Sequence, residues 1–255
     1  MRSSRIIRSI AATAAFGLVA MPGLAAAASN TLVSYASSWR VLDNGTDQTP
    51  AALPSATHFA APTYVESAAW RTETVQSGKV LGYGDNTRAS FPTQTPNLFF
   101  SPTNALPNTN KYITTYFRQS FTVADASAVS ALVLHVRRDD GIIVFVNGTE
   151  VARDNMPAGA YTSTTFASSI IDSAAEYAEQ TINIPTTSLV TGQNLIAIEL
   201  HQRDGTSSDI TFAAELVATT LDAQIPEAPV TVLLSLGGVA VLGAATVVTR
   251  RRAAA

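Results

Sequence analysis

The sequence predicts an all-β fold in which two antiparallel sheets pack face to face. Between the two ends of the chain, apolar and polar residues alternate along short segments, and this period of two is the pattern of a half-buried strand. Turn-forming residues separate the segments. The central region has no persuasive helical period, so two packed sheets are the simplest arrangement that buries the apolar faces.

Nine segments are expected to be strands. In chain order they are 39–42, 79–83, 113–123, 132–137, 142–146, 149–153, 181–184, 194–201 and 209–218. The segment 142–146 is apolar on both faces, which predicts a central strand covered on both sides. A turn at Asp139-Asp140-Gly141 should precede it. Asn147-Gly148, whose residues tolerate positive φ, should form a tight hairpin after it.

One long connection interrupts this pattern. Residues 84–110 contain four prolines and three phenylalanines, and connections of this length are uncommon unless they bind something or are disordered. The aromatic residues argue against pure disorder, and cover for a sheet edge is favoured over a binding role. Elsewhere, Trp39 and Trp70 are expected in the core, because large aromatic side chains bury readily.

Both ends of the chain carry the features of targeting signals. Residues 1–28 are typical of a secretory signal peptide, with three arginines, then an apolar stretch, then four alanines for cleavage. Residues 230–249 contain no charged group, and as a helix they would span about 30 Å, the thickness of the hydrocarbon core of a bilayer. Arg250-Arg251-Arg252 would keep this end cytoplasmic.

These signals divide the chain into five parts. They are a signal peptide (1–28), a β sandwich (29–219), a linker (220–229), a transmembrane anchor (230–249) and a basic cytoplasmic tail (250–255). We therefore expect an exported protein at the cell surface, held in the cytoplasmic membrane by its C-terminal helix. The order of Pro226-Glu227-Ala228-Pro229, apolar span and arginine cluster resembles a PEP-CTERM bacterial sorting signal, with an alanine interrupting the motif, so permanent anchoring and proteolytic processing both stay open.

The expected extracytoplasmic part is acidic and contains no cysteine. Residues 29–229 carry 10 basic and 19 acidic side chains, a net charge of −9. Nucleic acid is a poor partner, because its phosphates need lysine and arginine to neutralise them. Cations such as Ca²⁺, which prefer oxygen ligands, suit this charge better. Without cysteine, disulfides, thiol catalysis and cysteine-based metal centres are excluded.

Four segments resemble galactose-binding-like jelly-roll modules, in the version attached to secreted bacterial metallophosphoesterases. They are 81–85 (Leu-Gly-Tyr-Gly-Asp), 111–117, 138–148 (Arg-Asp-Asp-Gly followed by an apolar run and Asn-Gly) and 194–201. The resemblance covers roughly residues 30–219 and implies a jelly-roll sandwich. It leaves the ligand open, because members of the family bind carbohydrate, mediate adhesion or act as spacers.

Candidate ligand-binding residues lie at strand ends that could meet at one rim of the sandwich. Sugars favour aromatic faces with a few converging polar groups. The candidates of this kind are Tyr83, Asp85, Tyr112, Asp139, Asp140, His201 and Arg203. A carbohydrate or another envelope component is therefore the expected ligand.

Glu199 and His201 lie two residues apart on an expected strand, so their side chains share a face. This pair suits half of a metal site or a polar sugar contact. A solvated face is the favoured interpretation, because antiparallel sheets often have one wet side. His135 has the same interpretation.

A structural calcium site is expected on other residues. Asp43-Asn44-Gly45-Thr46-Asp47 concentrates oxygen donors around a glycine, as a calcium loop requires, although an ordinary turn explains it equally well. The resemblance implies an early loop and a residue near the last strand as ligands, here Asp43, Asn44, Asp47 and Glu215. Calcium should then raise the melting temperature of residues 29–229. Identical melting curves with calcium and with a chelator would contradict this.

No catalytic centre is evident. The chain has three histidines, and the histidine-bearing metal motifs of metallophosphoesterases are missing. No nucleophile elbow, His-Glu-x-x-His helix or phosphate loop occurs. Asp139 and Asp140 suit a glycosidase in principle, but adjacent aspartates at a turn are usually turn formers. We expect a non-catalytic surface module; an adhesive protein that contacts other proteins, and an unrecognised glycosidase or esterase, are the alternatives.

Overall fold

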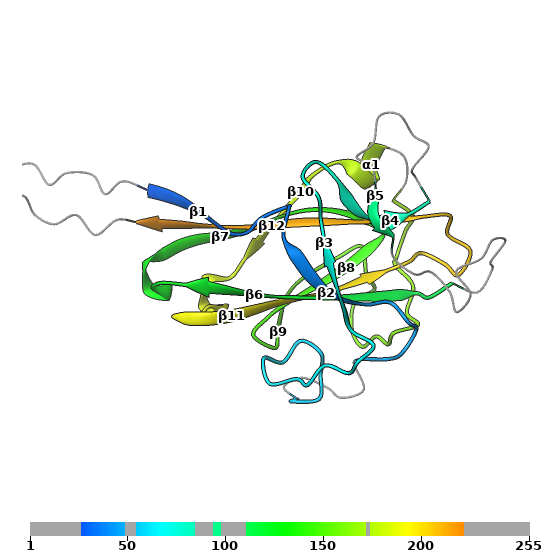
Figure 1. Ribbon diagram of the computed structural model, residues 1–255, viewed down its shortest axis with the longest axis horizontal. Coiled ribbons are helices and arrows are strands. Elements are labelled where there is room, and N and C mark those ends of the chain that lie inside the picture. The colour runs from blue at the N-terminus through cyan, green and yellow to red at the C-terminus, as the bar shows by residue number, and fades with distance from the viewer. Residues whose placement is uncertain (1–26, 49–54, 85–93, 98–110, 172–173, 222–255) are drawn as a thin grey trace, which may run out of the picture. The chain divides into compact units, whose positions relative to one another are not determined.

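Two six-stranded sheets make up the described part of the protein (Figure 1). The computed structural model describes residues 27–48, 55–84, 94–97, 111–171 and 174–221. The expected anchor at 230–249, and all but the last two residues of the expected signal peptide, lie outside these ranges. Within them, every helix is too short to span a bilayer.

The first sheet has the order β10-β7-β12-β4-β5, and β1 pairs with β12 beside this path. Its strands are β1 (Ala27–Val33), β4 (Val80–Tyr83), β5 (Gln94–Asn97), β7 (Val129–Asp139), β10 (Gln180–Ile184) and β12 (Ile210–Leu221). The pairs are antiparallel except for β4 and β5, which are parallel. Residues 94–97 of the long connection therefore cover the edge of β4, as the sequence favoured.

The second sheet has the order β3-β2-β6-β11-β8-β9 and is antiparallel throughout. Its strands are β2 (Ser38–Leu42), β3 (Arg71–Thr74), β6 (Thr114–Val123), β8 (Gly141–Val146), β9 (Thr149–Asp154) and β11 (Gly192–His201). Short connecting helices are η1 (Ala126–Ala128), α1 (Ala174–Tyr177) and η2 (Thr186–Ser188). The all-β class and the two sheets are confirmed.

The main core lies between the sheets, where the alternating apolar residues meet. Trp39 of β2 is fully buried and packs edge-on against Phe212 of β12, at a centroid distance of 5.2 Å, and against Phe117 of β6. Each such buried side chain contributes roughly 1.5–3 kcal/mol. The prediction that Trp39 lies in the core is confirmed.

A second core covers the outer face of the second sheet. The segments 55–70 and 155–171 lie over this face, and Phe59 and Trp70 pack there against Ile143 and Phe145 of β8. Trp70 is thus also buried. The strand β8 is covered on both sides, as its apolar sequence predicted.

The two expected turns around β8 differ in outcome. Asn147 (φ 51°) and Gly148 (φ 82°) form the hairpin between β8 and β9, as predicted. Asp139 and Asp140, joined by a cis peptide bond, do not make a hairpin turn. Because β7 and β8 belong to different sheets, the chain crosses there from one sheet to the other.

Candidate ligand-binding site

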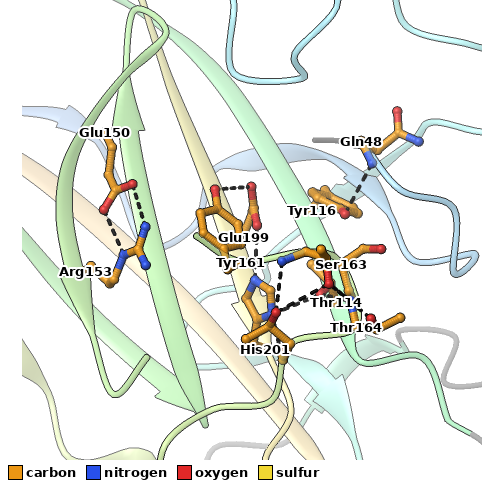
Figure 2. Close-up of polar contacts among 12 residues, drawn as sticks. Gln48, Thr114, Tyr116, Glu150, Arg153, Tyr161, Ser163, Thr164, Glu199 and His201 are labelled. Atoms are coloured by element: carbon orange, nitrogen blue, oxygen red, sulfur yellow. Dashed lines mark hydrogen bonds and ion pairs between the residues drawn. The ribbon is translucent and has the colours of Figure 1, made fainter. Parts of the chain in front are cut away.

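A strap, which we define as residues 155–171, forms one wall of two hollows beside the ends of β7 and β11. It connects β9 towards α1 and carries many hydroxyl side chains. The hydrogen bonds that tie it to the body of the sandwich include Tyr161 to Glu199, Ser163 to Thr114, Thr165 to His201, Ala167 to Gln202 and Ile171 to Asp140. The first two are drawn in Figure 2. The strap is therefore a fixed wall.

Glu199 and His201 lie beneath the strap and are completely buried. Their side chains meet at 3.0 Å between Oε2 and Nε2, and the Tyr161 hydroxyl donates to Oε1 of Glu199 at 3.1 Å (Figure 2). The expectation of a solvated face is wrong, because the strap covers this side of the sheet. Burial raises the pKa of the Glu199 carboxyl, while hydrogen bonds from His201 and Tyr161 act against this rise.

The surroundings of His201 fix which ring nitrogen carries hydrogen. Nδ1 lies 2.9 Å from the carbonyl oxygen of Thr165, which can only accept. Nδ1 also lies 3.0 Å from Thr114 Oγ1, whose own hydrogen is donated to the carbonyl of Ser163 at 2.7 Å. Nδ1 is therefore a donor, and Nε2 shares a proton with Glu199.

The proton on Nδ1 decides whether Thr114 could act as a nucleophile. Its hydroxyl lies next to the His201 imidazole, which in turn contacts the Glu199 carboxylate, and Thr114 lines a hollow. A nucleophile needs an adjacent nitrogen that is free to take its proton. Nδ1 already carries hydrogen toward Thr165, so it is not placed to activate the hydroxyl. The three residues act together to hold the strap.

We call the first of the two hollows beside the strap the aromatic hollow. Its volume is about 320 Å³. Its wall combines two aromatic rings with hydroxyls and one ammonium group; the lining side chains are Thr46, Lys111, Tyr112, Ile113, Thr114, Ser163, Thr164 and Phe166, with the backbone of Gly45 and Gly205. Phe166 of the strap is 45% exposed although it is large and apolar. An aromatic face beside several hydroxyls is the surface that a sugar ring requires.

Gly45 seats the ring of Tyr112. It has φ of +77°, and a Cβ built on it would lie 2.5 Å from two ring carbons of Tyr112. A side chain at this position would therefore displace the ring as well as strain the backbone. The glycine that suggested a calcium loop thus allows the tyrosine to lie against the backbone of that loop.

We call the second hollow beside the strap the acidic hollow. Its volume is about 260 Å³. It shares the strap and the loop after β11 with the aromatic hollow, and its lining is Asp139, Asp140, Ile170, Ile171, Glu176, Arg203, Asp204, Ser207, Ser208 and Asp209. Among the described residues of this lining, five carry carboxyl groups and one, Arg203, is cationic. This described part of the lining is therefore predominantly acidic.

Asp140 and Asp139 have different environments. The Asp140 carboxylate accepts from the backbone N–H of Ile171 at 2.7 Å and of Arg203 at 2.8 Å. Its hydrogen bonds to distant segments show that the turn-former interpretation is wrong for this residue. Asp139 is 2% exposed and its Oδ2 has no hydrogen-bond partner.

Burial raises the pKa of Asp139 to about 11. The hydrogen bond with Asp140 and the charges of Asp140, Asp209 and Glu176 act in the same direction, because each disfavours a second negative charge. Asp139 is therefore a neutral acid at pH 7. Asp139, whose pKa is strongly raised, lines the acidic hollow. Residues with strongly shifted pKa values are often found at functional sites.

The structure brings some of the predicted ligand-binding residues together. Asp139, Asp140 and Arg203 line the acidic hollow, and Tyr112 lines the aromatic one. His201 lies beneath the strap, and Tyr83 is buried, its hydroxyl accepting from Gln202 at 3.0 Å. Asp85 lies outside the described residues.

Several lining residues were missed by sequence reasoning. Phe166, Glu176 and Asp209 complete the two hollows. For Phe166 and Glu176, the available signal is the length of the connection 155–179, because long ordered connections are often functional. Nothing in the composition of this connection indicates which residues turn inward. Asp209 lies instead in the loop between β11 and β12, and no sequence signal marked it.

The predicted calcium ligands do not form one group. Asp43 is buried and forms an ion pair with Arg71, and Asn44 accepts from Thr46. Glu215 lies on β12 in the first sheet, paired with His135 of the neighbouring strand β7. No three acidic, histidine or cysteine side chains in the described ranges are placed to share a metal ion. Calcium at these residues stays a prediction, which the melting experiment tests.

Comparisons with known proteins give only distant matches. No protein-family model and no curated protein matches the chain. Solved structures that resemble it include a β-glucuronidase of Bacteroides uniformis (13% identity, TM-score 0.42, covering 76% of this chain and 18% of the enzyme). Others are a β-glucuronidase from an uncultured Clostridium (11%, 0.41, 81% and 31%) and a glycosyl hydrolase family 2 member from Bacteroides cellulosilyticus (12%, 0.39, 76% and 20%). This chain thus spans less than a third of each of these proteins, and similarity at this level carries no argument about activity.

Proposed function

We propose that this chain is an exported, non-catalytic surface module whose sandwich binds carbohydrate in the aromatic hollow. The observation that carries the proposal is the pairing of Tyr112 and the exposed Phe166 with hydroxyls from Thr46, Ser163 and Thr164 around one hollow of about 320 Å³. Pyranose rings present an apolar face and a polar edge, which match such a wall.

The fixed walls of the hollow support this proposal. Tyr112 lies against Gly45, and the strap that carries Ser163 and Phe166 is bonded to buried residues of β6 and β11. Preformed walls bind a ligand without the cost of ordering loops. Because His201 Nδ1 faces the carbonyl of Thr165, it is not placed to activate the Thr114 hydroxyl as a nucleophile, which supports a binding role over hydrolysis by that hydroxyl.

The leader and the apolar C-terminal span support the location in this proposal. Residues 1–28 would direct export, and residues 230–249 with the following arginines would retain the sandwich at the outer face of the cytoplasmic membrane.

Replacing Tyr112 with alanine should weaken glycan binding by about tenfold or more, equivalent to about 1.4 kcal/mol. The loss follows from removing the aromatic face, whereas the backbone of the hollow stays in place. A glycan array with the full chain identifies a ligand, and titration of that glycan measures the change. Phe166→Ala should act in the same direction.

Tyr35→Ala is the matched control, because this ring packs on Arg137 away from either hollow. Equal glycan affinity of the Tyr112→Ala and Tyr35→Ala proteins would contradict the proposed site. An array without any bound glycan would contradict the function.

A second candidate function is adhesion to another protein. Two large apolar side chains of the strap are exposed, Phe166 at 45% and Ile170 at 64%, and exposed apolar groups suit protein contacts. Tight binding to a partner protein that is lost in Ile170→Ser, with no glycan signal, would favour this function.

A further inference from the structure

The chain contains the tripeptide Asn-Gly-Thr twice, and the fold gives the two copies different surroundings. Asn44-Gly45-Thr46 lies in the loop after β2, and Asn147-Gly148-Thr149 makes the hairpin between β8 and β9. Asparagine before glycine is prone to lose its side-chain amide, because the following backbone nitrogen has no side chain to shield it. Since the tripeptide is the same, a difference in reactivity between the copies must come mainly from the fold.

The side chain of Asn147 is held in place. It is half-buried, and its Nδ2 donates to the carbonyl of Ser188 at 2.9 Å and to Oδ1 of Asn194 at 2.8 Å. Its Oδ1 accepts from the backbone N–H of Leu195 at 2.9 Å. Rotation of this amide toward Gly148 would break all three hydrogen bonds, so this copy is protected.

The side chain of Asn44 is accessible. Asn44, Gly45 and Thr46 are all exposed. Oδ1 of Asn44 accepts from the Thr46 backbone N–H at 3.1 Å and from the Thr46 hydroxyl at 2.6 Å. Both donors lie only two residues along the chain, so they hold the side-chain amide over the backbone of its own loop. They also draw electron density from the amide carbon, which favours attack on that carbon by the Gly45 nitrogen.

We propose that Asn44 is a site of spontaneous deamidation that alters the aromatic hollow as the protein ages. The Gly45 nitrogen forms a bond to Cγ of Asn44, while the amide nitrogen leaves as ammonia and takes up the proton that Gly45 loses. The product is a cyclic imide. Water then opens either carbonyl of this ring, which leaves aspartate or isoaspartate at position 44.

Gly45 connects this reaction to the aromatic hollow. Its backbone lines the hollow, and a Cβ built on it would lie 2.5 Å from two ring carbons of Tyr112. Isoaspartate adds a carbon to the backbone directly before this glycine, so Gly45 would no longer keep its position against the ring. Deamidation should therefore displace Tyr112. The expected loss of ligand binding in the hollow rests on the proposed function.

Peptide mapping by mass spectrometry, on the full chain aged at 37 °C and pH 8, tests the modification. We expect Asn44 to deamidate at least about tenfold faster than Asn147 in the folded protein, because only Asn147 must first break three hydrogen bonds to other segments. In guanidinium chloride the two copies should react at similar rates. Equal rates in the folded protein, or an Asn44 that reacts only when the chain is denatured, would overturn the proposal.

Asn44→Ser is the matched variant, because its hydroxyl can still accept from Thr46 and it has no amide to lose. The NMR signals of the Tyr112 ring, assigned with Tyr112→Phe, should shift on ageing in the wild type and stay unchanged in Asn44→Ser. Unchanged ring signals in fully deamidated protein would overturn the effect on the hollow.

Neither measurement uses a sugar, so their outcome does not depend on the glycan proposal. Where a glycan from the array binds fresh protein, aged wild type should bind it at least about tenfold more weakly than aged Asn44→Ser. Equal affinity of the two aged proteins, with Tyr112 displaced, would count against the glycan site and leave the deamidation site standing.

Discussion

Asp139→Asn should stabilise the protein increasingly as the pH rises. In the folded chain the pKa of Asp139 is raised to about 11 from an ordinary value of 3.8, mainly by burial. Between these values the folded state holds a proton that the unfolded state has lost. The free energy of unfolding of the wild type therefore falls by up to about 1.4 kcal/mol per pH unit over this interval.

Asparagine has nearly the same shape as aspartic acid and does not titrate. The variant therefore does not lose unfolding free energy at this position as the pH rises. The difference in unfolding free energy between variant and wild type should widen by about 2–4 kcal/mol from pH 5 to pH 8. Urea denaturation of both proteins at several pH values measures it. Asp125→Asn is the control, because the Asp125 carboxyl is exposed, its pKa is lowered by Ser127, and it stays ionised throughout this range. Parallel stability curves for wild type and Asp139→Asn would show that Asp139 is ionised in the folded chain.

His201→Ala should destabilise the protein by about 3–5 kcal/mol, because it leaves the buried Glu199 without its main partner. It also removes the donor to the carbonyl of Thr165, one of the bonds that hold the strap. The side chain has no exposed surface, so water cannot replace these bonds without opening the strap.

Chemical denaturation measures the stability loss, and limited proteolysis locates it. Cleavage within 155–171 should become fast in His201→Ala and stay slow in the wild type. His135→Ala is the matched control, since this imidazole is partly exposed beside Glu179, and its loss should cost less than about 1 kcal/mol. Equal stability of the two histidine variants would contradict the role of His201.

The strands were predictable because their apolar residues face a core between two sheets. All nine expected segments are strands, and Asn147-Gly148 makes the expected hairpin. Three strands were missed. β1 begins within the alanine run assigned to the signal peptide, β3 consists of four polar residues, and β5 lies in the proline-rich connection. Such strands are set by pairing with a neighbour, which the local sequence does not encode.

The candidate site was predictable only in part. Asp139, Asp140 and Arg203 were placed at one rim because they end or follow strong strands. The burial of Glu199 and His201 was not predicted. A period of two in the sequence shows which side chains share a face of a strand, but it does not show what covers that face. The cover is an irregular strap, whose contacts depend on long-range packing.

A crystal structure of the full chain with the best glycan from the array tests the central claim most directly. The account predicts a sugar ring lying against Tyr112, between the 43–47 loop and strap residues 163–166. A sugar bound elsewhere on the sandwich, with the aromatic hollow filled only by solvent, would contradict it.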